Sequence, residues 1–281
     1  MALKLMYITN NPEVALIAEK NGVDRIFVDM EWIGKTARQG GMDTVQSHHT
    51  IEDILAVRKA IEHAELLVRI NPIHEATACY GSSKEEVDEV IRAGADIVML
   101  PYFKTLEEAK RFTEYVDGRA KTMLLVETPE AVEIIEDILA LPGIDEVYVG
   151  LNDLSLGYGM KFMFEPLANG VVEKLTDKCR RAGILFGFGG IAMPGRGDLP
   201  SEYVIREHCR LGSSSVILSR SFCNTQIITD LSEVERIFAE GVQKVRMLEA
   251  ECAAHMEEKD DFLERNRVEL VEKVKDICRK K

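Results

Sequence analysis

The sequence lacks the cysteine patterns of a disulfide framework and of a zinc module. Its 6 cysteines are scattered, with no C-x-x-C pair, so neither a disulfide-bonded scaffold nor a zinc ribbon fits. It has no run of ~18 apolar residues, the length that a membrane-spanning helix requires. The first apolar stretch breaks at Asn10-Asn11-Pro12, too early for a secretion signal. These absences predict reduced thiols in a cytoplasmic protein outside the membrane.

Positive charge is also scarce. The chain has 35 Lys and Arg residues against 48 Asp and Glu residues, a net charge of -13. Such an acidic surface repels phosphate backbones and anionic lipids, so we expect no nucleic acid and no membrane as partner. A small anionic substrate remains compatible with this charge, because a local site can be positive or can hold a metal ion.

The turn after the first apolar run, Ile8 to Pro12, contains no glycine, whereas an open doubly wound sheet usually carries a glycine-rich phosphate turn there. Short apolar runs instead alternate with longer helical patterns along the whole chain. We predict strands at residues 4–9, 25–30, 66–71, 96–102, 122–128, 146–151, 184–191 and 215–220. Helical patterns lie at residues 12–22, 50–64, 83–94, 105–116, 129–143, 167–182, 202–211 and 231–251. This alternation predicts an α/β protein with a closed (β/α)8 barrel.

The barrel is expected to occupy residues 1–255 as the catalytic domain, followed by a C-terminal helical extension at residues 256–281. That extension has an apolar stripe formed by Leu263, Leu270, Val274 and Ile277. A stripe of this kind must be covered, either by the chain's own barrel or by a neighbouring subunit. We expect a homo-oligomer in which this extension lies at the subunit interface.

Charged residues stand at the ends of three predicted strands, where the active site of a (β/α)8 barrel lies. Arg69 interrupts the apolar run LLVRIN, and a buried cation there is either an anion ligand or half of an ion pair across the barrel. We favour the ligand. Glu127 ends the fifth strand and Asp153 follows the sixth, and two such carboxylates suit a hard divalent cation. The structural alternatives are an ion pair between Glu127 and Arg69, and a turn at Asn152-Asp153.

The segment after the second strand is a further candidate. It begins with Glu31 and the single tryptophan, Trp32, and continues as a long polar loop that contains His48 and His49. Long loops in compact domains are often functional, and histidine can act as acid or base near neutral pH. The alternative is that both histidines are simply exposed residues ahead of a helix.

Two weaker signals follow later in the chain. The glycine-rich run from residue 186 to residue 197 either lets backbone N–H groups approach an anion or relieves crowding in the barrel. Arg220 ends the eighth strand and is a second candidate anion ligand. Lys104 is the nominal Schiff-base lysine, but nothing in the sequence singles it out.

The strings VRIN, LPYFKTLEEA, LLVETPEAV and GLNDLSLGYG resemble the HpcH/HpaI aldolase and citrate lyase β-subunit family over residues 24–219. The resemblance implies a pyruvate-type barrel in which Glu127 and Asp153 hold Mg²⁺ or Mn²⁺. It also implies that Arg69 binds the 2-oxo oxygen and that backbone groups from Gly150 to Asp153 bind the carboxylate. Glu31, Gly150 and Asn152 complete the expected substrate-binding set.

The chain departs from that family at one functional position. The aldolases carry a Glu-His pair after the second strand, whose histidine takes part in acid/base work, and here the pair reads Glu31-Trp32. His48 and His49, which lie on the same loop, are therefore the candidates for the missing proton-transfer role.

The resemblance implies an aldol or retro-aldol reaction in which a metal and Arg69 stabilise the enolate oxygen of pyruvate or a related 2-oxo acid. The expected partners are this small 2-oxo acid and an aldehyde, with a sugar-like aldehyde as one acceptor class. Two alternatives stay open: a CoA-thioester lyase of the citrate lyase type, and a non-catalytic barrel subunit. The missing histidine favours the latter, whereas Glu127, Asp153 and Arg69 argue against it.

Overall fold

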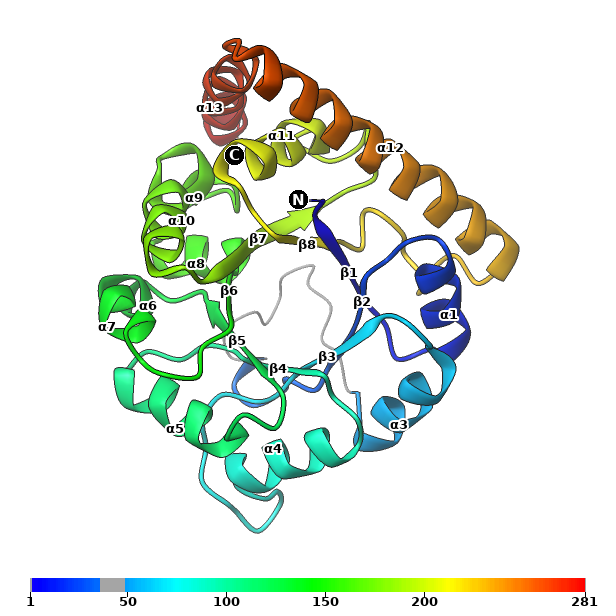
Figure 1. The fold of residues 1–281 in the computed structure, drawn as a ribbon, viewed down its shortest axis with the longest axis vertical. Helices are drawn as coiled ribbons and strands as arrows, with labels where there is room; N and C mark the ends of the chain where they lie inside the picture. The colour runs from blue at the N-terminus through cyan, green and yellow to red at the C-terminus, as the bar shows by residue number, and fades with distance from the viewer. Residues whose placement is uncertain (1, 36–48, 281) are drawn as a thin grey trace.

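A computed structural model of the chain, which describes residues 2–35 and 49–280, contains a closed parallel barrel in which each strand pairs with the next and β8 pairs with β1 (Figure 1). The strands are β1 Lys4–Ile8, β2 Arg25–Asp29, β3 Glu65–Arg69, β4 Ile97–Leu100, β5 Lys121–Val126, β6 Glu146–Val149, β7 Leu185–Ile191 and β8 Ser215–Leu218. The strands are almost wholly buried, because helices cover their outer face and side chains fill the barrel. The predicted fold is confirmed.

The helices begin where the sequence places capping residues. Thr50, Ser82 and Thr105 each form a capping box with the acidic residue three positions later. The helices described are α1 Pro12–Lys20, α3 Ile51–Ala60, α4 Ser83–Arg92, α5 Leu106–Val116, α6 Pro129–Glu133, α7 Ile135–Leu139, α8 Leu151–Gly157, α9 Glu165–Ala168, α10 Val171–Ala182, α11 Ser201–Leu211, α12 Leu231–Glu258 and α13 Phe262–Lys280. None of them is long and apolar enough to cross a membrane.

Two local predictions need correction. The helix predicted at residues 129–143 is divided into α6 and α7 at Ile134. The helix predicted from residue 167 is divided into α9 and α10, because Gly170 adopts φ 85°. Asn152 and Asp153, for which a turn was the structural alternative, lie in the first turn of α8, which begins after Gly150 without a side-chain cap and so lacks the usual sequence signal.

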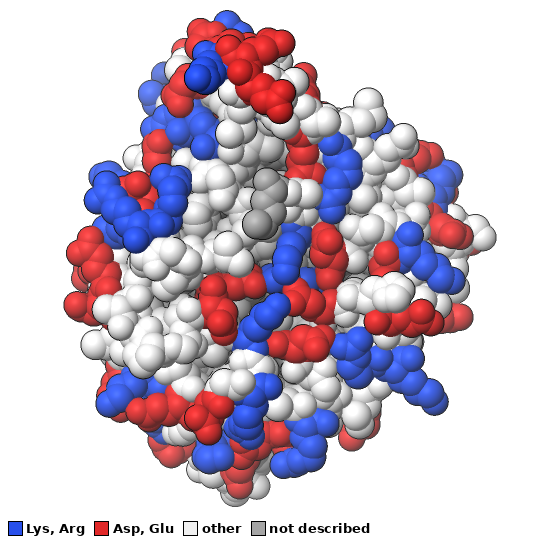
Figure 2. Space-filling view, in the orientation of Figure 1, with Lys and Arg blue, Asp and Glu red and all other residues white. Residues whose placement is uncertain are grey.

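A buried ionic network closes the end of the barrel where the strands begin. The Arg25 side chain is fully buried, and its Nη1 lies 2.7 Å from Glu146 Oε2 while its Nε lies 2.8 Å from Glu65 Oε2. Lys4 and Lys121 also contact Glu65. Acidic and basic side chains gather over the barrel axis in the space-filling view (Figure 2). Because this end is filled by paired charges, a ligand must enter at the opposite end.

The C-terminal extension packs on the chain's own barrel. α13 lies against α11 and α9, and its Leu270 and Val274 side chains are buried in the main core (Figure 1). Leu263 and Ile277, the other members of the stripe, are half-buried. The expectation that a neighbouring subunit covers this stripe is therefore wrong. The chain's own barrel covers it, which was the alternative.

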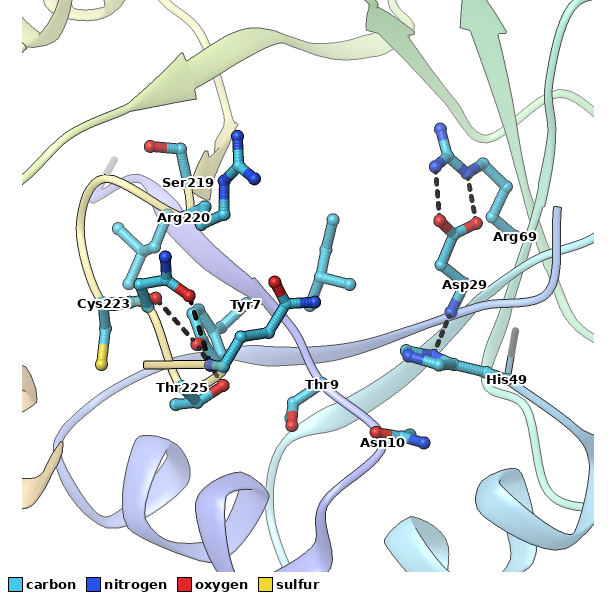
Figure 3. Close-up of a pocket in the computed structure, with 14 residues that line it drawn as sticks. Tyr7, Thr9, Asn10, Asp29, His49, Arg69, Ser219, Arg220, Cys223 and Thr225 are labelled. Carbon is cyan, nitrogen blue, oxygen red and sulfur yellow. Dashed lines mark hydrogen bonds and ion pairs between the residues drawn. The ribbon is translucent and has the colours of Figure 1, made fainter. Parts of the chain in front are cut away.

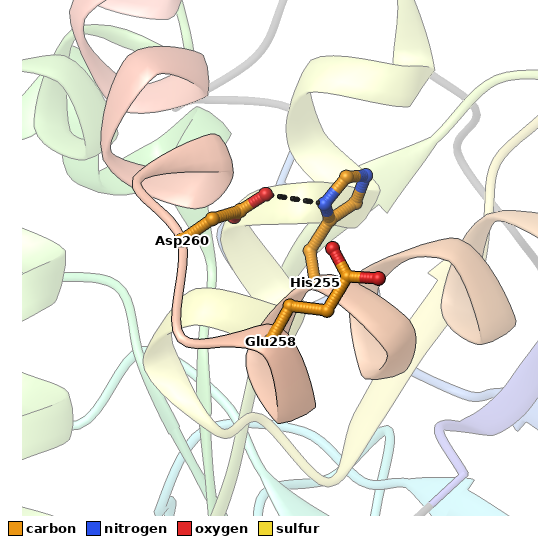
Figure 4. Close-up of side chains that lie close together, drawn as sticks. All are labelled: His255, Glu258 and Asp260. Atoms are coloured by element: carbon orange, nitrogen blue, oxygen red, sulfur yellow. Dashed lines mark hydrogen bonds and ion pairs between the residues drawn. The ribbon is translucent and has the colours of Figure 1, made fainter.

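The connection between α12 and α13 contains a His-acid cluster, shown in Figure 4. His255 Nδ1 lies 2.7 Å from Asp260 Oδ2, and its ring stacks on Phe262 with ring centroids 3.9 Å apart. Asp260 Oδ1 also accepts a hydrogen bond from the Phe262 backbone N–H at 2.9 Å. With Glu258 the cluster offers three possible ligand atoms, but these bonds explain it as a helix connection.

Candidate active site

Arg69 is held by a carboxylate on the neighbouring strand. Arg69 and Asp29 are the last residues of β3 and β2 and lie opposite each other in the register. Arg69 Nε donates to Asp29 Oδ1 at 2.8 Å, and Nη2 donates to Oδ2 at 2.7 Å. This bidentate geometry fixes the plane of the guanidinium. The sequence analysis favoured Arg69 as an anion ligand and did not predict this ion pair. The alternative that it left open was an ion pair across the barrel, whereas Asp29 lies on the adjacent strand.

Two more charged residues complete the cluster around Asp29 and Arg69. Lys35 Nζ lies 2.9 Å from Asp29 Oδ2 and 3.4 Å from Glu31 Oε2. Arg69 Nη1 lies 3.4 Å from the same Glu31 oxygen. Two cations therefore face two carboxylates, and the side chains of Asp29, Glu31 and Lys35 are almost wholly buried. Glu31 is thus a partner of both cations.

Burial and pairing oppose each other in this cluster. Burial alone would raise the pKa of Asp29, but the Arg69 guanidinium and then the Lys35 ammonium hold it well below its ordinary value. Burial alone would lower the pKa of Arg69, but Asp29, Glu31 and Glu127 hold it above its ordinary value. Both groups therefore stay charged across the physiological range. Glu127, one of the two predicted metal ligands, is therefore within electrostatic reach of Arg69.

Glu127 and Asp153 lie on neighbouring elements at the open end. Glu127 follows β5, Asp153 lies in the first turn of α8 just after β6, and both line a cavity of about 460 Å³. Their exposed fractions are 4% and 8%. Two buried carboxylates that face a polar cavity provide the hard oxygen donors that Mg²⁺ and Mn²⁺ prefer. The donor set therefore fits a divalent cation.

The backbone around Glu127 is shaped to hold its carboxylate. The Tyr102 N–H donates to Glu127 Oε1 at 3.0 Å. Tyr102 adopts φ 48°, a left-handed conformation that costs a non-glycine residue ~1–3 kcal/mol. Sequence reasoning missed Tyr102, because a strained backbone angle has no signature in residue type. This conformation orients the Tyr102 N–H toward the buried Glu127 carboxylate.

Gly150 is required by the position of Glu127. A Cβ at Gly150 would lie 2.7 Å from Glu127 Oε2 and 2.9 Å from Glu127 Cβ. We therefore expect Gly150→Ala to displace this carboxylate and to destabilise the fold by roughly 1–3 kcal/mol, the usual cost of overpacking. Urea denaturation measures it. Gly190→Ala is the matched control, because its Cβ would meet nothing closer than 3.5 Å, and equal stability of the two variants would contradict the steric argument.

The predicted carboxylate-binding backbone is only partly available. The Gly150 N–H donates to Val126 O at 3.0 Å and therefore belongs to the strand pairing. The Leu154 N–H donates to Gly150 O at 3.1 Å and so forms the first hydrogen bond of α8. The Asn152 N–H lies in the first turn of α8, where backbone N–H groups have no partner within the helix, and it is the donor that the expected substrate-binding set can offer. The Asn152 side chain lies beside Asp153, with Nδ2 3.5 Å from Oδ1.

His49 has a defined tautomer. Its Nδ1 accepts a hydrogen bond from the Asp29 backbone N–H at 3.0 Å, so the neutral ring carries its proton on Nε2. Burial is the main reason why the pKa of His49 lies below its ordinary value. The ring is therefore a neutral hydrogen-bond donor rather than a proton-accepting base at Nε2. His48, the other predicted histidine, lies outside the described residues.

The position of the missing family histidine is firmly occupied by Trp32. The Trp32 backbone N–H donates to Asn71 Oδ1 at 2.9 Å, and the Trp32 ring packs edge-on against Tyr80 at 5.4 Å between centroids. Trp32 is 47% exposed. An indole has no titratable nitrogen in the physiological range, so proton transfer from this position is excluded.

The glycine-rich run serves packing at Gly187. A Cβ there would lie 2.5 Å from Ser215 O and 2.6 Å from Tyr148 Cε2. Of the two interpretations of this run, relief of crowding is therefore the one that Gly187 supports.

Lys104, the nominal Schiff-base residue, is ion-paired with Glu130 at 3.0 Å and half exposed.

A second cavity, of about 210 Å³, opens beside Asp29 and Arg69 (Figure 3). Its lining also comes from residues 7–10 at the end of β1 and just after it, residues 218–220 at the end of β8, residues 223–226, and His49. The metal-ligand cavity lies on the β4, β5 and β6 side of the mouth, whereas this cavity lies on the β8, β1 and β2 side. Of this lining, sequence reasoning found Arg69, His49 and Arg220. It missed residues 223–226, because they resemble an ordinary polar connection.

Comparison with known proteins places these features in context. A family model described as HpcH/HpaI aldolase/citrate lyase matches residues 4–188, which include Arg69, Glu127 and Asp153. A 4-hydroxy-4-methyl-2-oxoglutarate aldolase of Chaetomium globosum is 25% identical over 64% of this chain and 72% of its own length. One of Hapsidospora irregularis is 24% identical over 68% of this chain and 75% of its own length. The structure of an HpcH/HpaI aldolase from Desulfitobacterium hafniense has the same fold, with a TM-score of 0.58 at 19% identity over 87% of this chain and 93% of that one.

Proposed function

The chain belongs to the HpcH/HpaI aldolase/citrate lyase family and is a carbon–carbon lyase of the class II aldolase type, and we propose that its enolate donor is pyruvate and its cofactor Mg²⁺ or Mn²⁺. The observation that carries the proposal is that Arg69, Glu127 and Asp153 all lie at or just after the ends of strands, at the same mouth of the barrel. Arg69 lines one cavity, together with Asp29 and His49, and the buried carboxylates Glu127 and Asp153 line another. An aldol reaction needs places for a donor and an acceptor at one such mouth.

Glu127 and Asp153 would hold the divalent cation. When bound, the cation supplies positive charge that stabilises the oxygen of the enolate. Tyr102 and Gly150 contribute by fixing the Glu127 carboxylate, through a hydrogen bond and through a close contact. The Asn152 N–H, in the first turn of α8, would be a donor for the carboxylate of the 2-oxo acid.

Arg69 would bind the 2-oxo oxygen with the N–H groups that do not donate to Asp29. Of its five N–H donors, two are directed at Asp29. The two hydrogen bonds to Asp29 fix the orientation of the guanidinium. Its remaining N–H groups are therefore already in place when negative charge develops on the enolate oxygen. Lys35 contacts Asp29, and Glu31 contacts both Lys35 and Arg69. We therefore assign Asp29, Glu31 and Lys35 a positioning role.

His49 would act as a hydrogen-bond donor to the hydroxyl oxygen of the aldol. Its Nδ1 is occupied by the Asp29 backbone N–H, so the Nε2–H of the neutral ring remains for a ligand in the second cavity. This role differs from the acid/base role expected from sequence, because the lowered pKa of His49, chiefly a result of burial, disfavours the imidazolium.

We also propose a cytoplasmic homo-oligomer. All 6 cysteines are free, which suits a reducing compartment. Met247 and Met256 on α12 and Val268 on α13 are 65%, 56% and 59% exposed. Exposed apolar side chains on neighbouring helices support an association surface on the outer face of this helix pair.

The proposed donor chemistry is tested without an acceptor. We expect the protein to exchange the methyl protons of pyruvate with heavy water when Mg²⁺ or Mn²⁺ is supplied, and to lose this exchange when a chelator removes the metal. Proton NMR of the pyruvate methyl signal measures the rate. Pyruvate without protein, at the same metal concentration, is the control. Exchange that survives chelation would contradict a metal-dependent enolate, and absent exchange would exclude pyruvate as donor.

A further inference from the structure

Two cysteines from neighbouring helices line one cavity. Cys209 belongs to α11 and Cys252 to α12, and the cavity that both of them line has a volume of about 420 Å³. α11 and α12 lie side by side (Figure 1). Arg206 of α11 joins the two helices at this level, with its Nη2 3.0 Å from Glu251 Oε2 on α12. Helix packing therefore brings together two thiols that are far apart in the sequence.

The two thiols interact directly and differ in character. The Cys209 thiol donates a hydrogen bond to the Cys252 sulfur, which raises the pKa of Cys209 above its ordinary value, and burial acts in the same direction. The same hydrogen bond lowers the pKa of Cys252, and the positive charge of Arg206 also lowers it against the effect of burial. Cys252 is therefore the more nucleophilic sulfur of the pair, because the thiolate is the reactive form of cysteine.

Other buried cysteines of the chain have the opposite character. Burial raises the pKa of Cys179 to about 12 and that of Cys223 to about 11. Such thiols stay protonated and react slowly. Cys252 differs from them because it has both a cation and a second thiol beside it. A second thiol within reach is what allows an oxidised cysteine to form a disulfide instead of a higher oxide.

We propose that Cys209 and Cys252 are a reactive thiol pair that hydrogen peroxide converts into a disulfide between α11 and α12. The Cys252 thiolate attacks one peroxide oxygen, the O–O bond breaks, and the leaving hydroxide takes the proton of Cys209 to form water. The Cys209 sulfur then attacks the Cys252 sulfenic acid and the S–O bond breaks.

The second hydroxide takes up the proton that Cys252 released on ionisation, so the two sulfurs lose two electrons and two waters form. Hydrogen peroxide is little larger than water, which occupies ~30 Å³, and the cavity beside the two thiols has room for it. A disulfide of this kind is compatible with a reducing compartment, where disulfides are usually transient.

Peptide mapping tests the proposal on the full-length protein. The reduced chain is treated with hydrogen peroxide, its remaining thiols are alkylated, and it is digested with trypsin without reduction. Cleavage after Lys and Arg leaves Cys209 in the peptide of residues 207–210 and Cys252 in the peptide of residues 247–259. We expect mass spectrometry to find these two peptides linked, and to find them separate after treatment with dithiothreitol.

Three variants make the assignment specific. Cys209→Ser and Cys252→Ser should each abolish the linked peptide, and in Cys209→Ser dimedone should trap a sulfenic acid on Cys252. Cys79→Ser is the matched control, because it removes an exposed cysteine and should keep the linked peptide at the yield of wild type. Oxidation of Cys79 in wild type without a link between Cys209 and Cys252, or a link from either of them to another cysteine, would overturn the proposal.

Thermal denaturation shows whether the fold itself holds the two sulfurs at bonding distance. A disulfide that fits the folded chain restricts mainly the unfolded chain, so we expect oxidised wild type to melt roughly 5–10 °C above the reduced protein. Dithiothreitol should reverse the rise, and peroxide should not raise the Tm of Cys252→Ser. A lower Tm in the linked protein would overturn the proposal, because it would show that the bond forms only by distorting the helix pair. Neither measurement depends on the aldol reaction.

Discussion

Arg69→Ala is expected to lower the rate of metal-dependent pyruvate proton exchange by roughly 100- to 1000-fold, the range found when one preorganised oxyanion donor is removed. The reason is the bidentate pair with Asp29, at 2.8 and 2.7 Å, which aims the remaining N–H groups before charge develops. Lys35 stays 2.9 Å from Asp29 and keeps that buried carboxylate paired, so we expect the variant to fold. Proton exchange by NMR and thermal denaturation measure the two effects.

Arg69→Lys separates charge from geometry. A lysine ammonium is a point charge and cannot hold both oxygens of Asp29 while it donates to a substrate. We therefore expect it to restore little of the exchange rate. Near-normal exchange in Arg69→Ala would show that the buried cluster of Asp29, Glu31, Lys35 and Arg69 serves only to stabilise the end of the barrel.

The fold could be predicted from sequence because its signals are local. Strands such as β4 and β6 are continuous apolar runs, and capping residues such as Thr50 and Thr105 mark the starts of helices. The same regularity places polar residues at strand ends, which is how Arg69, Glu127 and Asp153 were found. In a closed parallel barrel, a residue that ends a strand must lie at one mouth.

The partners of these residues could not be predicted in the same way, because they depend on contacts between segments that are far apart or on backbone angles. Asp29 was visible in the sequence, but nothing there says that its carboxylate faces Arg69, 40 residues later. The positive φ of Tyr102 and the uncapped start of α8 have no residue signature. The apolar stripe of α13 was recognised, yet its cover by α11 and α9 depends on a helix packing that the sequence pattern does not specify.

Removal of either predicted metal ligand is expected to weaken Mn²⁺ binding by at least roughly 100-fold, since loss of a partner that only orients a metal ligand already costs ~10–100-fold. Glu127→Gln and Asp153→Asn keep the size of each side chain but remove its charge. Isothermal titration calorimetry with Mn²⁺ measures the affinity directly. Glu130→Gln is the matched control, because Glu130 lines the same cavity but is about half exposed and ion-paired with Lys104.

Thermal denaturation gives an independent measure of the same site. A cation that binds only the folded chain stabilises it by about 2.7 kcal/mol at a concentration of 100 times its dissociation constant. We therefore expect Mn²⁺ to raise the Tm of wild type and of Glu130→Gln, and to leave Glu127→Gln and Asp153→Asn almost unchanged. Unchanged affinity in both ligand variants, together with unchanged Tm shifts, would exclude Glu127 and Asp153 as the metal site.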